Sequence, residues 1–489
     1  MSELTIWQNG ASQTVTFSGQ PMLSEILTQA GYLIAHPCGG RGTCRKCAVE
    51  LEGAVSSPNE AELKANQRLS CQARLLGNTS VILPDTTKLE QIETGIDDIH
   101  SGFHPMPGHY GASVDIGTTT LAVRVYDLTT GKCIGEAAAR NSQTAVAADV
   151  MGRIDSACKG NGSFLQRLVL QDIDNLLKTA LKGADPSVQV HSLVLTGNTT
   201  MLYLLNGLNP ESLSHAPFHA DNLFDVEMRT CEKHAYLPPC ISAFVGADIT
   251  CAILASGMCK SNETALLCDI GTNGEIALWN NGQLFVTSTA AGPAFEGAGI
   301  SCGCGSVQGA IDQVWLQGNE LQIHTICNTS PIGICGSGLI DAIAAGLICG
   351  CINETGSLAD EAFTILDTVC LIPQDIRAVQ LAKAAIAAGI ETLTETAGIS
   401  AEDIKTLYIA GGFGSHLNVE SAATIGLIPS ELKQRVKILG NASLSGAVSA
   451  LLDTNQWERM RAIASCATHV DLGGNPKFND NFIEHMMFE

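Results

Sequence analysis

The sequence is poor in aromatic residues and in basic residues. Phenylalanine, tryptophan and tyrosine make up 5% of the 489 residues, while glycine occurs 49 times. We therefore expect a core of alanine, isoleucine, leucine and valine, with many tight backbone turns. The sequence has 27 lysines and arginines but 49 aspartates and glutamates, which gives a formal net charge of −22. Such a surface repels phosphate groups, so we expect no nucleic acid and no anionic membrane among the partners.

An export signal and a clear membrane span are also missing. Residues 1–10 have no basic stretch followed by an apolar one, which predicts a cytoplasmic protein. The least polar window, 331–351, is long enough to cross a bilayer, but it is rich in glycine and carries Asp341 in its middle. We interpret it as a buried segment, with a membrane helix as the alternative. At about 150 residues per domain, the length predicts two to four domains.

Cysteine is abundant, with 19 residues, an odd number that argues against a disulfide framework in a chain without an export signal. Four of these residues, Cys38, Cys44, Cys47 and Cys71, have the spacing C-x5-C-x2-C followed by one distant cysteine. A 2Fe–2S cluster needs four thiolates, and the pattern is similar to that of plant-type ferredoxins, one residue wider in the first gap. The alternatives are a structural zinc site, which usually has two C-x2-C pairs, and unrelated buried thiols.

The elements expected around these cysteines are mostly strands. A hairpin is expected around Asn9-Gly10, a helix from Pro21 to Gln29, and a strand that carries Cys71 back to the cysteine loop. The expected strands are 4–7, 14–17, 46–51, 68–75 and 80–83. Residues 1–85 thus resemble an α+β ferredoxin-like domain of the β-grasp type. Residues 86–109, acidic and then rich in proline and glycine, are expected to form a linker.

From residue 110 onward strands and helices alternate, which predicts an α/β fold. A short motif occurs twice in this region: Asp115-Ile116-Gly117-Thr118 and Asp269-Ile270-Gly271-Thr272. Each copy follows an apolar strand pattern and precedes another, so we expect two related subdomains, roughly 110–260 and 261–489.

These glycine turns have a chemical logic. An aspartate at a strand end holds a divalent cation, usually through water, as Mg²⁺ prefers. A glycine lets the backbone approach a phosphate, and successive amides and threonine hydroxyls donate to its oxygens. Two such turns that face each other would hold a triphosphate from both sides. A third turn, 411–414, follows an expected strand at 406–409, and its glycines would leave room for adenosine.

The three turns together resemble those of the acetate and sugar kinase, Hsp70 and actin (ASKHA) superfamily, whose domain is a duplicated ribonuclease H-like α/β ATPase fold. The resemblance implies ATP and Mg²⁺ as ligands. The implied first phosphate motif is Asp115, Gly117, Thr118, Thr119 and Thr120. The implied second phosphate motif is Asp269, Gly271, Thr272, Asn273 and Gly274. The implied adenosine motif is Gly411, Gly412, Phe413 and Gly414.

A ferredoxin-like domain fused to an actin-like ATPase resembles the reductive activators of corrinoid proteins. Further stretches that match this family are 195–201, 292–303, 333–341 and 425–429. The resemblance implies that ATP drives one electron from the cluster to Co(II) of a corrinoid protein in a methyltransferase system. It also implies a low-potential electron donor upstream, and a homodimer is a further expectation. Because Asp115 follows the linker almost at once, we expect the separate middle domain of this family to be absent.

Two alternatives to this function come from different classes. One is a small-molecule kinase or ATPase with a sensory cluster. The other is an ATP-dependent activator of a different low-potential enzyme, such as a 2-hydroxyacyl-CoA dehydratase.

Some residues carry competing interpretations. Asp248 and Glu296 are candidate catalytic residues that would orient the hydrolytic water, or they are a helix-capping aspartate and a surface glutamate. The glycine-rich loop 297–305 would contact the corrinoid partner or form an ordinary turn. The pairs Cys302/Cys304 and Cys349/Cys351 would hold a second cluster, although core thiols are favoured.

Overall fold

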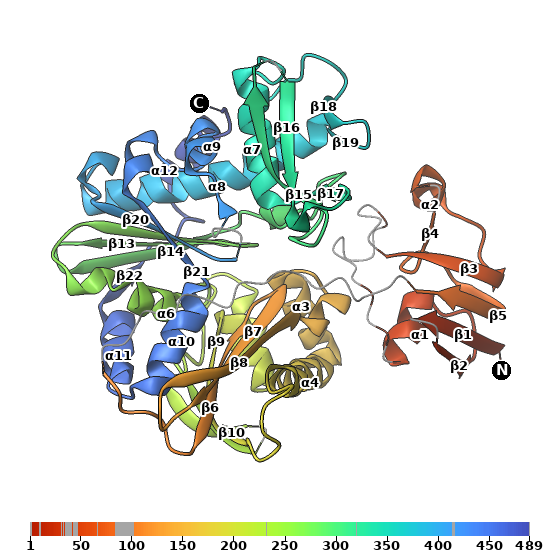
Figure 1. Cartoon of the computed structure of the whole chain (residues 1–489), viewed down its shortest axis with the longest axis horizontal. Coiled ribbons are helices and arrows are strands. Elements are labelled where there is room, and N and C mark those ends of the chain that lie inside the picture. The colour runs from red at the N-terminus through yellow and green to blue at the C-terminus, as the bar shows by residue number, and fades with distance from the viewer. Residues whose placement is uncertain are drawn as a thin grey trace.

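The computed structural model describes residues 2–8, 11–30, 32, 34, 42, 47–65, 67–83, 102–230, 232–318, 320–412 and 416–488. Several predicted features lie outside these residues: the Asn9-Gly10 turn, Cys38, Cys44, most of the linker, Phe413 and Gly414. In Figure 1 the described chain forms a small unit near the N-terminus and two larger lobes.

The N-terminal unit is a five-stranded sheet crossed by one helix, as expected for a ferredoxin-like β-grasp fold. The strand order is β2-β1-β5-β3-β4, with β1 antiparallel to β2 and parallel to β5. Helix α1 packs Leu23 and Leu27 against Leu4 and Ile6 of β1. The elements are β1 (Ser2–Gln8), β2 (Ala11–Phe17), α1 (Leu23–Gln29), β3 (Ala48–Val55), α2 (Glu60–Ala65), β4 (Arg68–Leu69) and β5 (Leu75–Ile82).

The predicted strand 68–75 is wrong in its second half. Strand β4 ends at Leu69, and the chain turns so that the backbone amides of Gln72 and Ala73 both donate to the carbonyl of Leu69. Leu69, Ser70 and Cys71 are buried in succession, which a strand with alternating faces does not allow in a one-sided sheet. Cys71 therefore sits in a tight turn rather than on a strand.

The first large lobe is a six-stranded sheet with strand order β10-β11-β9-β6-β7-β8. Strands β6, β7 and β8 are antiparallel neighbours, and β9 runs parallel to β6. Its elements are β6 (Tyr110–Ile116), β7 (Thr120–Asp127), β8 (Lys132–Arg140), α3 (Val150–Ser156), α4 (Gly162–Ala180), β9 (Val190–Gly197), α5 (Thr199–Leu205), β10 (Val226–Thr230), β11 (Lys233–Leu237) and α6 (Ala247–Ser256).

The second lobe repeats this arrangement with strand order β21-β20-β12-β13-β14-β22, in which β12, β13 and β14 are antiparallel neighbours and β20 runs parallel to β12. The predicted duplication and the α/β actin-like fold are thus confirmed. The sheet and its C-terminal helices are β12 (Ala265–Ile270), β13 (Gly274–Asn280), β14 (Gln283–Thr289), α8 (Pro373–Ala397), β20 (Thr406–Ala410), α9 (Val419–Thr424), β21 (Val436–Gly440), α10 (Ala442–Leu452), α11 (Gln456–Cys466), β22 (Ala467–His469) and α12 (Pro476–Glu484).

Between β14 and α8 the second lobe carries a smaller part, seen above the sheet in Figure 1. Its elements are β15 (Ala310–Gln317), β16 (Glu320–Thr325), β17 (Gly333–Ile334), α7 (Gly336–Ile348), β18 (Phe363–Leu366) and β19 (Val369–Leu371). The apolar window 331–351 forms β17 and α7, and α7 is buried from Gly336 to Gly346. Across the part of the chain that the structure describes, every helix is too short or too polar to cross a membrane.

The two lobes share one buried cluster, in which helices α6 and α10 lie between the two sheets (Figure 1). It includes Val194 and Tyr236 of the first sheet and Leu267 and Val286 of the second. The two glycine turns that follow β6 and β12 lie close together, since Thr119 and Thr272 both donate hydrogen bonds to Glu296.

Candidate cluster and nucleotide sites

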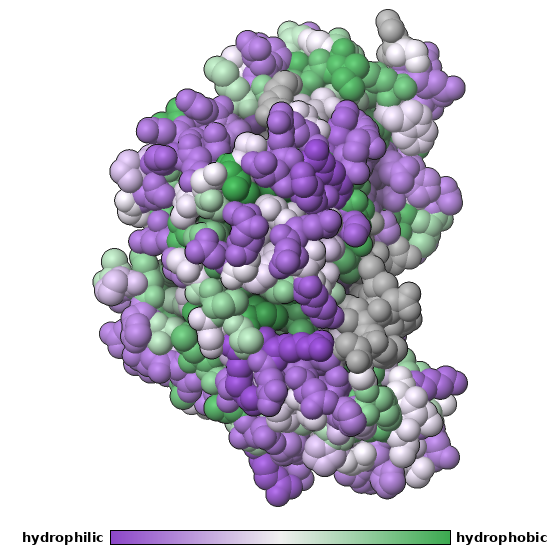
Figure 2. Space-filling view, turned by 90° about the vertical axis from the view of Figure 1, so that its left-hand side faces the viewer, coloured by the Kyte–Doolittle hydropathy of each residue, from purple (hydrophilic) through white to green (hydrophobic). Residues whose placement is uncertain are grey.

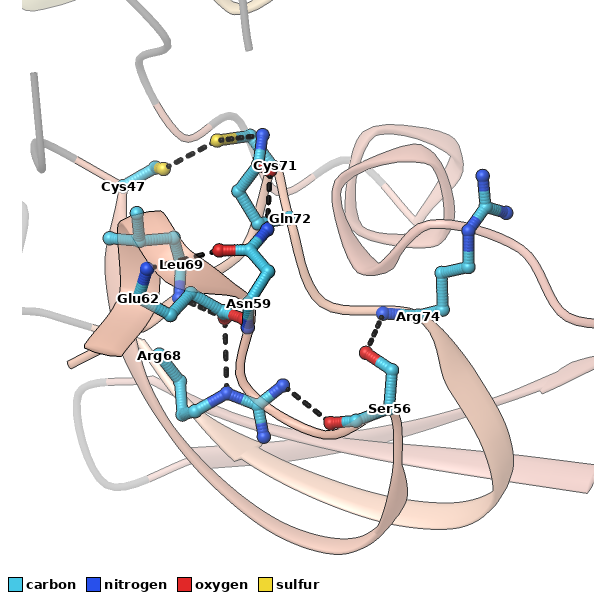
Figure 3. Close-up of polar contacts among 9 residues, drawn as sticks. All are labelled: Cys47, Ser56, Asn59, Glu62, Arg68, Leu69, Cys71, Gln72 and Arg74. Carbon is cyan, nitrogen blue, oxygen red and sulfur yellow. Dashed lines mark hydrogen bonds and ion pairs between the residues drawn. The ribbon is translucent and has the colours of Figure 1, made fainter. Parts of the chain in front are cut away.

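Cys47 and Cys71 lie together at the edge of the N-terminal sheet. Their sulfur atoms are 3.3 Å apart, and the two residues are 0% and 7% exposed (Figure 3). Leu69, Ile34 and Ala48 pack around them. Two thiolates so close in an apolar setting are a donor set that one iron of a 2Fe–2S cluster can accept. The residues that the structure describes thus fit two of the four predicted ligands.

A buried carboxylate fixes the segment that leads to Cys71. Glu62, 1% exposed, accepts hydrogen bonds from the backbone amides of Leu69 and Asn59 and from Nε of Arg68, each at 3.0 Å (Figure 3). Arg68 neutralises its charge inside the domain. The sequence analysis missed Glu62, because no motif marks a glutamate nine residues before a ligand.

The first glycine turn lies between β6 and β7, with Asp115 near the end of β6. Its carboxylate accepts hydrogen bonds from Nδ2 of Asn441 and Oγ of Ser443, both at 3.0 Å. Burial nevertheless raises the pKa of Asp115, because the two hydrogen bonds offset only part of the lost hydration. Both partners stand at the start of α10, more than 300 residues away in the sequence, so no local pattern could have indicated them.

The backbone of this turn is fixed from several sides. A Cβ on Gly117 would lie 2.5 Å from the carbonyl oxygen of Thr120, so only glycine fits there. Asn141 donates to the carbonyl of Gly117 at 2.8 Å, and Asn198 donates to Oγ1 of Thr118 at 3.0 Å. The fully buried guanidinium of Arg153 donates to the carbonyl of Thr118, and burial lowers its pKa to about 10. The glycine and these hydrogen bonds together define the backbone conformation of the turn.

Glu296 joins the first turn to the second. Its carboxylate accepts a hydrogen bond from Oγ1 of Thr119 at 2.8 Å and another from Oγ1 of Thr272 at 2.7 Å. Thr119 belongs to the turn of the first lobe and Thr272 to the turn of the second. The interpretation of Glu296 as an ordinary surface glutamate is therefore wrong, since one side chain spans both predicted phosphate turns.

Four carboxylates influence one another beside these turns. Burial, and then the charges of Asp115 and Asp269, raise the pKa of Asp248 to about 8. Burial and the charge of Asp115 raise the pKa of Asp269 to about 7, and burial raises the pKa of Glu275 well above its usual value, with further contributions from Asp248 and Asp269. Without a cation, part of this cluster therefore holds protons at neutral pH.

Asp248 is in the first turn of α6, and its carboxylate accepts a hydrogen bond from the adjacent backbone amide of Ile249, at 2.8 Å. Within the described ranges, no three acidic, histidine or cysteine side chains gather closely enough to chelate a metal ion directly.

The third predicted turn begins where β20 ends. A Cβ on Gly411 would lie 2.6 Å from the carbonyl of Ile270 and 2.8 Å from Oδ1 of Asp269, and its φ of +94° also requires glycine. Gly412 is exposed, with open space where a Cβ would be. The beginning of this turn therefore lies directly against the second phosphate turn.

The remaining cysteine pairs, Cys302/Cys304 and Cys349/Cys351, differ in how far they are buried. Cys302 and Cys304 are half-buried in the loop beside β17, where the amide of Cys304 bonds the carbonyl of Ile334, and burial raises the pKa of Cys302 to about 12. Cys349 is exposed, so the interpretation as a core thiol is wrong for that residue.

The buried carboxylates predict how stability depends on pH. Their folded-state pKa values lie above the unfolded value of about 3.9, so folding becomes less favourable as pH rises from about 4 to 8. We expect Asp248→Asn, without nucleotide, to raise Tm more at pH 8 than at pH 5, by about 2–4 °C for each kcal/mol gained. Thermal unfolding at the two pH values measures this, with the exposed Asp480→Asn as the matched control. An equal gain at both pH values would contradict the prediction.

Three family models match this chain. Residues 7–76 match the 2Fe-2S iron-sulfur cluster binding domain, residues 110–261 the RACo middle region, and residues 263–489 the C-terminal ASKHA domain of RACo. The prediction that the middle domain is absent is therefore wrong. The middle-region model falls on the first six-stranded lobe, which the sequence analysis had assigned wholly to the ATPase.

Individual relatives agree with these models. The corrinoid activation enzyme RamQ of Eubacterium limosum is 32% identical over 418 residues, which are 78% of this chain and 70% of that enzyme. A Co(II) methylated amine-specific corrinoid protein reductase of Methanosarcina barkeri is 25% identical over 417 residues, 76% of each chain. The solved structure of a reductive activator for corrinoid,iron-sulfur protein has a TM-score of 0.74 at 26% identity and covers 99% of this chain and 98% of that one.

Proposed function

The chain belongs to the family of reductive activators of corrinoid proteins, and from this membership we propose that it uses ATP to pass one electron from a 2Fe–2S cluster to Co(II) of a corrinoid protein, giving Co(I). The family resemblance noted in the sequence is thereby confirmed. The observation that carries the proposal is that one chain holds a close, buried thiol pair and two phosphate turns bridged by one carboxylate. We infer that the corrinoid protein belongs to a methyltransferase system.

Cys47 and Cys71, with Cys38 and Cys44, would hold the cluster, which when bound supplies a one-electron carrier. Glu62 keeps the turn that carries Cys71 in place through its bonds to Leu69 and Asn59. Because Cys47 and Cys71 are buried, the thiolates they become are shielded from water and from small oxidants.

In the nucleotide site, the backbone and hydroxyls of the turns would bind the phosphates. We propose that Gly117, Thr118, Thr119 and Thr120 act from the first lobe and Gly271, Thr272, Asn273 and Gly274 from the second. Asp115 and Asp269 would hold Mg²⁺ through its water, and the cation would lower the pKa of these carboxylates so that they give up their protons. Gly411, Gly412, Phe413 and Gly414 would receive the adenosine.

Glu296 couples nucleotide binding to the two lobes. Without nucleotide, the carboxylate of Glu296 accepts hydrogen bonds from the hydroxyls of Thr119 and Thr272. A bound phosphate would accept these hydrogen bonds instead. Binding of ATP therefore has to break a bridge between the lobes, and it frees Glu296 to orient the hydrolytic water. If ATP binding changes the equilibrium between two arrangements of the lobes from 1:99 to 99:1, the change takes about 5.5 kcal/mol of free energy. For the transfer of one electron, this free energy corresponds to about 240 mV.

Further parts of the proposal concern organisation. We propose a ferredoxin-like domain at 1–85, a linker at 86–109 and an actin-like region at 110–489. Its first subdomain, near 110–260, corresponds to the middle region, and its second, near 261–489, to the ASKHA domain. We also propose a low-potential electron donor upstream, assembly as a homodimer and a location in the cytoplasm.

The decisive experiment is an anaerobic assay with a Co(II) corrinoid protein, followed by the absorbance of Co(I). We expect reduction that requires both ATP and Mg²⁺, and ATP hydrolysis that requires the corrinoid protein. Reduction at the same rate without ATP would overturn the proposal. ATP-dependent phosphorylation of a small molecule in the absence of a corrinoid protein would favour the kinase alternative.

A further inference from the structure

A pair of cysteines lies outside the cluster and nucleotide sites, at the end of α7. Cys349 ends this helix and is exposed, Gly350 follows with a φ of +74°, and Cys351 is half-buried. Gly350, in the left-handed conformation, separates the two cysteines at the end of the helix. Cys349 and Cys351 both line the same cavity, so their thiols face one space.

The pair opens into a cavity of about 640 Å³. Its walls come from the β15–β16 hairpin, the end of α7 and the segment 359–364. Leu316, Leu321 and Phe363 supply apolar surface, and Ile348, 70% exposed, lies at the rim. Apolar residues also gather at the top of the molecule in Figure 2, the end where Figure 1 places β16 and β18. A cavity of this size accepts a small molecule rather than a protein.

We propose that Cys349 and Cys351 form a dithiol site that exchanges with small-molecule disulfides bound in this cavity. No part of the proposed ATP-driven electron transfer uses either residue, and none of the cluster or nucleotide residues lines the cavity.

The exchange balances in two steps. The thiolate of Cys349 attacks one sulfur of the small disulfide RSSR, so a mixed disulfide forms and RS⁻ leaves. Cys351 then loses its proton and attacks the Cys349 sulfur, and a second RS⁻ leaves. Both RS⁻ ions take up the two protons released by the cysteines, so the protein dithiol is oxidised to a disulfide and RSSR is reduced to two RSH.

The geometry gives each cysteine a distinct role. Cys349 is exposed and reaches an incoming disulfide first, while Cys351 lies deeper and acts on the mixed disulfide. The neighbouring thiol of Cys349, followed by burial, raises the pKa of Cys351, so this residue keeps its proton until the second step. Cα atoms two residues apart in a turn are closer than the roughly 7 Å of an extended chain, which is within the range that a disulfide bridges.

The test uses the full-length protein with its cluster, incubated anaerobically with glutathione disulfide. Free thiols are alkylated and each cysteine is assigned by peptide mass spectrometry. We expect Cys349 and Cys351 to become unavailable together, joined to each other and carrying no glutathione. The exposed Cys158, which has no other cysteine near it in the sequence, serves as the internal control that accepts glutathione.

Two variants separate the roles. In Cys351→Ser, Cys349 should keep the glutathione that it acquires. In Cys349→Ser, the rate at which Cys351 reacts with glutathione disulfide should be at least 10-fold lower than the rate of Cys349 in the wild type. The melting temperature and the iron content establish that each variant is folded. The proposal is overturned if wild-type Cys349 keeps its glutathione, or if Cys349 reacts no faster than Cys158.

Discussion

Replacement of Cys71 by serine is expected to abolish Co(II) reduction while nucleotide binding persists. The Cys71 sulfur lies 3.3 Å from that of Cys47 in a buried pocket, so loss of either thiol removes a ligand that no nearby described side chain replaces. The nucleotide turns belong to other sheets and share no residue with this pocket. We expect reduction to fall by at least about 100-fold, since even changes beside a metal ligand cost 10–100-fold.

The measurement combines iron analysis, visible absorbance and the affinity for a non-hydrolysable ATP analogue, all without oxygen. Cys158→Ser is the matched control, because Cys158 is exposed on the first lobe and should keep both the iron and the activity. A Cys71→Ser protein that retained two irons and full reduction would show that Cys71 is not a ligand.

The sequence predicted those elements that are determined by residues close together in the chain. The repeat at Asp115 and Asp269 predicted two strand–turn–strand units, and the structure has them at β6–β7 and β12–β13. Such a unit is recognisable because the apolar strand and the glycine of its turn are neighbours in the sequence. The spacing of the cysteines also predicted the ferredoxin-like domain, although Cys71 lies in a turn rather than a strand.

The partners of these motifs could not be predicted in the same way. Asn441 and Ser443 reach Asp115, and Arg153 holds Thr118, only because the sheets bring distant segments together. The chemistry of the motif does not require any of these three residues at a fixed number of positions from it, so no sequence spacing marks them. The middle domain was missed for a related reason, since its sheet repeats the topology of the second lobe and its sequence alone indicates an ordinary half of an ATPase.

The largest effect in the nucleotide site is expected from Glu296→Gln. Two threonine hydroxyls, one from each predicted phosphate turn, donate hydrogen bonds to Glu296. Burial and the neighbouring charges raise the pKa of Asp248 to about 8, so Asp248 holds a proton at neutral pH when no cation is bound. Of the two candidates, Glu296 is therefore the one that lies between both turns, where it is placed to orient the water. We expect Glu296→Gln to lower the turnover of ATP by about 100-fold or more, the usual contribution of a positioned base.

Asp248→Asn should behave differently, and the comparison decides between the two roles. Glutamine at 296 has the size to keep the bridge to Thr119 and Thr272, so its binding of ATP should stay within a few-fold of the wild type or become tighter, because a negative charge facing the phosphates is gone. Asparagine at 248 leaves the bridge intact but cannot become negatively charged when a cation binds beside Asp115 and Asp269, so more Mg²⁺ should be needed for half-maximal turnover. Titrations of ATP and Mg²⁺ under corrinoid-stimulated conditions measure both effects. If Glu296→Gln hydrolysed ATP at the normal rate while Asp248→Asn lost turnover at saturating Mg²⁺, the water-orienting role would belong to Asp248, and Glu296 would serve only to hold the lobes together before ATP binds.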